Sequence, residues 1–213
     1  MQSRIDPDVV KKMLLGAEKK INAHGWDQPC LLATINVIER DGEPVALGIS
    51  PLPFEIENPP GVNIARMGRQ MLIDGEIGKL MAENEPGFYG FAFIHEAWML
   101  KANEEQRREH LRSNRSIADT PGGIEIRSIM AITIYGDILA VVRERGKTAE
   151  VWADDDANVG VVSGRMTTGL LAMVRSVVGY LPDNDEGLQG LAERRDLIMA
   201  EERATEAEMK ADR

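Results

Sequence analysis

The sequence predicts an α+β domain, in which a central antiparallel sheet of about five or six strands is flanked by helices. Three observations support this fold class. The strand-like and helix-like segments follow the order α-β-β-α-β-β-β-β-α-α, whereas a doubly wound parallel sheet requires strands and helices to alternate. Short turn signals separate neighbouring strand segments, as they do in hairpins. The 213 residues are 43% hydrophobic and 28% charged, an ordinary globular composition that is sufficient for one large core.

The first segment predicts a helix. Asp6 is the expected N-cap, and Pro7 suits the first helical position because its missing N–H would be unsatisfied there anyway. Apolar residues then recur at helical spacing. Gly25 is expected to end this helix.

Two strands and a connection are expected next. Alternating apolar residues over 31–37 predict a strand that is covered mainly on one face. Asp41-Gly42 is a hairpin turn signal, so residues 45–49 are the expected returning strand. Four prolines within 51–60 exclude a central strand and predict an extended surface connection.

Residues 63–83 predict a second helix, in which glycines interrupt the apolar stripe. Gly68, Gly75 and Gly78 each weaken a helix by about 1 kcal/mol relative to alanine. They indicate either close packing of this helix on the sheet or a kink or early break. The segment FYGFAFIHEAWML, at 88–100, holds three of the four phenylalanines and is the expected central strand.

The segment 101–123 is rich in charge and poor in apolar residues, with five basic and four acidic side chains. We expect a short helix near 104–111 inside a mobile excursion that spans 102–122. Residues 124–153 predict three successive antiparallel strands. A helix capped by Ser163 should follow.

The expected domain organisation is one α+β domain over 1–184 and an acidic C-terminal helix over 185–213. That helix has nine acidic and five basic residues and only a thin apolar stripe. Because the stripe runs out before the helix does, we expect it to contact a partner as well as its own domain. The expected partner-binding residues are Leu188, Leu191 and Ile198.

Charge and cysteine content narrow the function classes. Lys and Arg number 25 against 35 Asp and Glu, and the net charge of −10 disfavours binding to nucleic acids and anionic membranes. Cys30 is the single cysteine, so neither an intrachain disulfide nor a cysteine cage for a metal is possible. No run approaches the roughly 20 apolar residues that span a bilayer. We expect a cytoplasmic protein without a cofactor.

The best enzymatic candidate combines Asp119, Glu125 and His95. Asp119 followed by Glu125-Ile126-Arg127 is similar to the acid and E-x-K arrangement of metal-dependent nucleases, whose carboxylates hold a hard cation. Arg127 stands where the lysine should be, and it remains protonated. Glu125 comes only six positions after Asp119, which leaves little room for the usual hairpin. An exposed glutamate at the start of a strand is therefore the favoured interpretation.

Three other patterns have weaker functional interpretations. Residues 95–99 begin like the zinc motif H-E-x-x-H, but Met99 replaces the second histidine and the segment reads as a strand. Residues 160–167 resemble a phosphate-binding loop with one residue missing and Arg165 in place of lysine, so a flexible connection is favoured. The arginines within 107–115 alternate with glutamates and have no aromatic neighbours, as expected for a solvated helix face.

One longer stretch carries a resemblance. IRSIMAITIYGDILAVVRERG, preceded by FAFIHEAW and followed by EVW, resembles proteins of unassigned function from phages of actinobacteria. The resemblance covers roughly residues 88–153. It implies a phage-encoded cytoplasmic accessory protein and carries no catalytic residue to this chain.

These observations favour a non-enzymatic protein that self-associates into a homo-oligomer and binds another protein, which the phage resemblance would make a host protein. The alternative is a metal-dependent phosphodiesterase or nuclease that uses Asp119, Glu125 and His95. The two classes predict different surfaces. An enzyme should gather several ionisable groups around one cleft, whereas a binding protein should expose a contiguous apolar patch.

Overall fold

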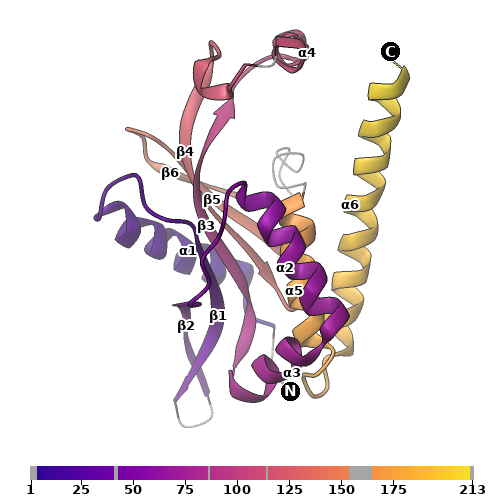
Figure 1. Cartoon of the computed structure of the whole chain (residues 1–213). Coiled ribbons are helices and arrows are strands. Elements are labelled where there is room, and N and C mark those ends of the chain that lie inside the picture. Colours follow the sequence, from indigo (N-terminus) through magenta and orange to yellow (C-terminus); the bar gives the residue numbers. More distant parts are fainter. Residues whose placement is uncertain (1–3, 41–42, 86, 114, 154–164, 212–213) are drawn as a thin grey trace.

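Six antiparallel strands form one sheet in the computed structural model of the chain (Figure 1). The structure describes residues 4–40, 43–85, 87–113, 115–153 and 165–211. The strands are β1 (Leu31–Arg40), β2 (Glu43–Pro51), β3 (Phe88–Leu100), β4 (Gly123–Thr133), β5 (Ile138–Glu144) and β6 (Ala149–Ala153). Their order across the sheet is β2-β1-β3-β4-β5-β6. The predicted antiparallel sheet with flanking helices is confirmed.

Helices cover both faces of this sheet (Figure 1). On one face α1 (Pro7–Asn22) contacts β2, β5 and β6, and on the other α5 (Arg165–Val178) contacts β3 and β4. Three more helices pack against α5, namely α2 (Pro60–Asp74), α3 (Glu76–Asn84) and α6 (Asp185–Ala211). Within the described part of the chain, no helix combines the length and apolar character that crossing a bilayer requires.

The strand β3 lies inside the sheet between β1 and β4, as the phenylalanine-rich segment predicts. All residues from Phe88 to His95 are buried, because helices cover the strand on both faces. In β4, alternate side chains point to opposite faces. Arg127 reaches Glu18 of α1, whereas Met130 accepts a hydrogen bond from Thr167 of α5, with 3.5 Å between Oγ1 and Sδ.

The single helix expected over 63–83 is in fact two helices, α2 and α3. The helix is interrupted at Gly75, whose φ of +71° favours glycine. The other two glycines do pack closely, but against α5 rather than against the sheet. A Cβ on Gly68 would lie 2.1 Å from the carbonyl oxygen of Gly169, and one on Gly78 would lie 2.3 Å from that of Ser176.

The first helix begins where the sequence predicts. The Asp6 side chain accepts a hydrogen bond from the N–H of Asp8 at 2.9 Å, and Pro7 is the first helical residue. The helix ends earlier than expected, at Asn22, and Gly25 follows in a loop with a φ of +89°. The predicted Ser163 cap, the 41–42 turn and most of the 160–167 loop pattern lie outside the described residues.

The charged connection between β3 and β4 contains α4 (Glu104–Ser113) and a short 3-10 helix, η1 (Ile117–Asp119). The helix expected near 104–111 is therefore confirmed. In Figure 1 this connection projects from the end of the β3–β4 pair, away from the helices that cover the sheet. None of the residues of α4 is buried.

Candidate functional site

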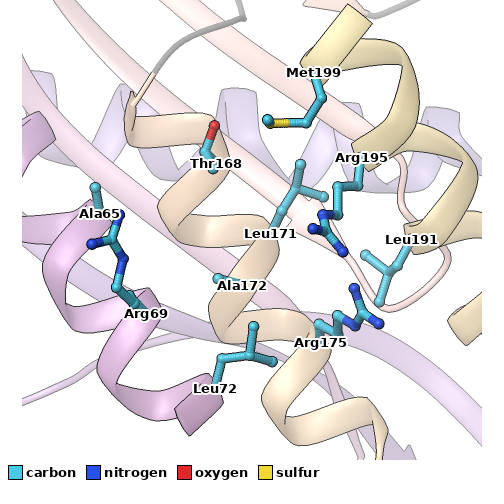
Figure 2. A pocket seen from close by; sticks show the side chains of 10 residues that line it. All are labelled: Ala65, Arg69, Leu72, Thr168, Leu171, Ala172, Arg175, Leu191, Arg195 and Met199. Atoms are coloured by element: carbon cyan, nitrogen blue, oxygen red, sulfur yellow. The ribbon is translucent and has the colours of Figure 1, made fainter.

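A groove of about 260 Å³ lies between three helices on the α5 face of the sheet (Figure 2). Its floor is α5, and its walls are α2 on one side and α6 on the other. The residues that line it are Ala65, Arg69 and Leu72 of α2, Thr168, Leu171, Ala172 and Arg175 of α5, and Leu191, Arg195 and Met199 of α6.

The lining residues follow helical spacing on each of the three helices. In α6 they are Leu191, Arg195 and Met199, which are four residues apart and therefore share one face of the helix. The α2 and α5 residues also recur at three- and four-residue steps. Each helix thus turns one mixed stripe toward the groove. Each stripe contains apolar residues and a single arginine.

Close backbone contacts hold the two walls in place. The meeting of Gly68 with Gly169 brings α2 directly against α5. At the start of α6, a Cβ on Gly187 would lie 2.5 Å from the carbonyl oxygen of Ile134, and one on Gly190 would lie 2.3 Å from that of Tyr135. A larger side chain at Gly68 would move α2 away from α5, and one at Gly187 or Gly190 would move the start of α6 away from the turn after β4, so these glycines fix the positions of the two walls.

The three arginines of the groove have no neutralising partner in the part of the chain that the structure describes. Among the described residues, the side chains of Arg69, Arg175 and Arg195 take part in no ion pair or hydrogen bond. Figure 2 shows Arg175 and Arg195 pointing toward each other beside Leu191, with Arg69 on the opposite wall. By contrast, Arg66, on the same helix as Arg69, is paired with Glu57 at 3.0 Å. The groove is thus a positive site on a chain whose net charge is −10.

The chemistry available at this groove is binding rather than proton transfer. Its described lining contains no carboxylate, imidazole or thiol, and arginine side chains do not give up their protons in proteins. Guanidinium groups are well suited to carboxylates and phosphates, because they present paired N–H donors. Leu171, Ala172 and Leu191 offer an apolar surface beside them. The arrangement suits a ligand that combines an apolar body with a negative charge.

The structure does not bring together the three residues that the alternative, enzymatic interpretation would use. Glu125 lies on the α1 side of β4, where Arg145 pairs with it at 2.5 Å. His95 lies on the α5 side of β3, where its ring packs edge-on against Phe93 at 5.2 Å between centroids. Asp119 is in η1, ahead of β4. No described hydrogen bond or ion pair links any two of the three.

His95 is a buried, neutral residue rather than a ligand in a zinc motif. His95 lies in the strand β3 rather than in a helix, and it is 7% exposed. Burial lowers the pKa of its imidazole to about 4, because the charged form loses its hydration there. Its Nδ1 atom has no hydrogen-bond partner among the described residues.

Carboxylates do meet near the end of α1, but arginines already neutralise them. Oxygen atoms of Asp27, Glu96 and Glu125 lie within 4.8 Å of one another. Arg127 binds Glu96 at 2.6 Å, and Arg145 binds Glu125. This cluster of alternating charges is typical of a salt-bridge network.

The same network continues into the core beneath α1. Arg127 lies 3.7 Å from Glu18, and both side chains are almost completely buried. Arg143 donates hydrogen bonds to both carboxylate oxygens of Glu18, each at 2.6 Å. The Trp26 ring lies 4.7 Å from the Arg127 guanidinium carbon. These contacts satisfy the buried charges and join α1 to the sheet.

The three predicted partner-binding residues differ in their placement on α6. Leu191 is 3% exposed and lines the groove from within its own domain. Leu188 is partly exposed, and the side chain of Ile198 lies outside the described residues. The groove arginines Arg69, Arg175 and Arg195 are not among the site residues that the sequence predicts. The available signal was an arginine inside the apolar stripe of each of three helices.

Comparison of the chain with protein-family models, with curated proteins and with solved structures gave no match.

Proposed function

We propose that this protein is a non-enzymatic binding protein, which receives apolar side chains of a protein partner in the groove between α2, α5 and α6. The observation that carries the proposal is the composition of the groove, an apolar floor rimmed by three arginines without described partners. Small-molecule pockets usually measure about 300–1,000 Å³. A groove of about 260 Å³ suits a few anchoring side chains better than a whole cofactor.

Exposed apolar residues of α2 and α3 support the same role. Leu72 lines the groove and is also partly exposed to solvent. Next to it, Ile73 is 75% exposed, and Leu80 of α3 is 59% exposed. Through Leu72, the apolar lining of the groove continues onto the exposed surface of α2, and exposed apolar surface of this kind is typical of protein interaction sites.

We also propose that the chain self-associates, because the exposed apolar residues of α2 and α3 would be covered in a dimer. Light scattering at micromolar concentration should then give at least twice the chain mass of 23.6 kDa. A monomer mass that persists throughout a dilution series would contradict self-association and leave the groove proposal standing.

The identity and location of the partner follow from the resemblance of residues 88–153 to phage proteins, which stays a prediction. Under that prediction the chain is a phage-encoded cytoplasmic accessory protein, and its partner is a host protein. The proposed groove does not depend on this origin, because it rests on the lining residues alone.

Filling the groove tests the proposed function. Ala172 lies on the groove floor, so Ala172→Trp should place a large ring where the partner's side chains would bind. Ala192→Trp is the matched control, because Ala192 is exposed on α6 and does not line the groove. Each variant is immobilised and used to capture proteins from a lysate of the source cells, after thermal unfolding has confirmed that both are folded.

The expected result is a protein that wild type and Ala192→Trp capture and Ala172→Trp does not. Identical capture by all three proteins would contradict a role for the groove, whichever proteins were retained.

A further inference from the structure

The charges in the groove define the chemistry of its occupant. Arg175 and Arg195 come from different helices, and Figure 2 shows their guanidinium groups pointing toward each other. Like charges that face each other repel, and neither group has an ion-pair or hydrogen-bond partner among the described residues. A carboxylate between them would accept hydrogen bonds from both guanidinium groups. The site therefore favours an anionic occupant.

The dimensions of the groove favour a helical occupant. Leu191 and Met199 line it over eight residues of α6, which is about 12 Å, or about two helical turns. Apolar atoms of Leu171 and Ala172 lie between the arginines of the two walls. An amphipathic helix can present apolar side chains one turn apart and a carboxylate on the same face. Such a face matches the groove, in which apolar atoms lie beside arginines.

We propose that the groove binds an acidic amphipathic helix of a partner protein, with apolar side chains on Leu171 and Ala172 and a carboxylate between Arg175 and Arg195. The proposal rests on the proposed function, since it names the chemistry of the partner at the same groove. The third arginine, Arg69, binds an acidic side chain on the opposite flank of that helix.

The test measures binding of two fluorescent helical peptides by anisotropy. Both are about fifteen residues long, about four turns, with leucines one turn apart. One peptide carries glutamates beside the leucines, and the other carries lysines at the same positions. The wild-type protein should bind the glutamate peptide about tenfold more tightly than the lysine peptide, and added salt should weaken that preference.

Variants assign this preference to the two arginines. In the double variant Arg175→Gln/Arg195→Gln, both peptides should bind with equal affinity. The control Arg66→Gln removes an exposed arginine of α2 that already has a carboxylate partner, so the tenfold preference should remain. Equal binding of both peptides to wild type, or a preference that survives in the double variant, would overturn the proposal.

Two further outcomes separate this proposal from the proposed function. If neither peptide binds while lysate capture still depends on Ala172, the acidic helix is wrong and the groove remains a protein-binding site. If the protein is a dimer that Arg175→Gln/Arg195→Gln converts to a monomer, the occupant is a second copy of the chain, and a foreign partner helix is overturned.

Discussion

Gly68 of α2 and Gly169 of α5 meet through their backbones, and a Cβ on either residue would collide with the other helix. From Gly68 the Cβ would lie 2.1 Å from the Gly169 carbonyl oxygen, and from Gly169 it would lie 2.6 Å from the carbonyl oxygen of Ile64. Backbone atoms cannot rotate aside as the end of a side chain can. The separation of α2 and α5 is therefore set by the absence of two methyl groups.

Gly68→Ala should lower the free energy of unfolding by about 1–3 kcal/mol, because α2 must move away from α5. Urea denaturation measures this loss. Gly61→Ala is the control in the same helix, since a Cβ there meets no atom within 4 Å. It should leave the stability unchanged or raise it by less than about 1 kcal/mol. A loss of equal size in both variants would contradict the close contact.

Arg127→Met should destabilise the protein by about 3–5 kcal/mol, because it leaves Glu96 without its described ion-pair partner and leaves Arg143 alone to neutralise the buried Glu18. Glu18 and Glu96 both face Arg127, at 3.7 and 2.6 Å. Arg145→Met is the control, since this arginine also lies over Trp26 but its side chain is 53% exposed. Chemical denaturation of both variants should show a much smaller loss for Arg145→Met. Similar losses would show that burial of the network does not matter.

His95 should make the protein less stable in mild acid. Its folded-state pKa of about 4 lies below the usual 6.5, so between these values the unfolded chain binds a proton that the folded chain does not. The contribution of His95 to the free energy of unfolding is fully present above pH 6.5, and it falls as the pH drops toward 4. From pH 7.5 to 5 the loss from this one group should be about 2 kcal/mol.

Denaturation curves at several pH values test this dependence. In His95→Gln, the free energy of unfolding should fall less between pH 7.5 and pH 5, by an amount close to the loss attributed to His95. His24→Gln, at an exposed histidine, should leave the pH dependence of stability unchanged. A wild-type profile that His95→Gln does not alter would contradict the predicted role of this histidine.

Neither Mg²⁺ nor Mn²⁺ should raise the melting temperature. The carboxylates Glu96 and Glu125 already bind arginines, and His95 lies on the other face of the sheet. A true site would stabilise the fold by about 2.7 kcal/mol at a hundredfold excess of metal over Kd. A metal-dependent rise that Glu125→Ala abolishes would instead favour the nuclease or phosphodiesterase alternative.

Trypsin should cut first within residues 102–122. None of the residues of α4 is buried, and the arginines at 107, 108, 112 and 115 supply cleavage sites. Elements with few buried contacts open more readily than the sheet does. Mass spectrometry of early digestion products identifies the first cut. Protection of this segment to the same extent as β3 or β4 would contradict the prediction.

The sheet could be predicted because its signals are local. Phe91 and Phe93 show the alternation of a strand whichever strands lie beside it, so β3 is evident from its own residues. Gly68 and Gly75 illustrate what local signals lack. One marks a close contact and the other a break, but both are glycines in an apolar stripe, and only the position of α5 distinguishes them.

The candidate sites were harder to predict because they depend on how distant segments are placed. The β3–β4 register separates His95 from Glu125, which the enzymatic alternative would group. The two residues lie on opposite faces, with His95 opposite Ser128 and Glu125 opposite Trp98. Arg69, Arg175 and Arg195 look like ordinary surface arginines of separate helices. Only the packing of α2, α5 and α6 makes them one site.

The helix α6 is held by close backbone contacts at its start only, among the contacts that the structure describes. Gly187 and Gly190 hold its start against the turn after β4, whereas Met199 lies nine residues, about 13 Å, beyond Gly190. A small tilt at the start of α6 moves Met199 much farther than Leu191, and methionine itself adapts its shape readily. Ligand selection should therefore be strict at the Arg175 end and tolerant at the Met199 end. A family of related peptides would then vary most at the positions that face Met199.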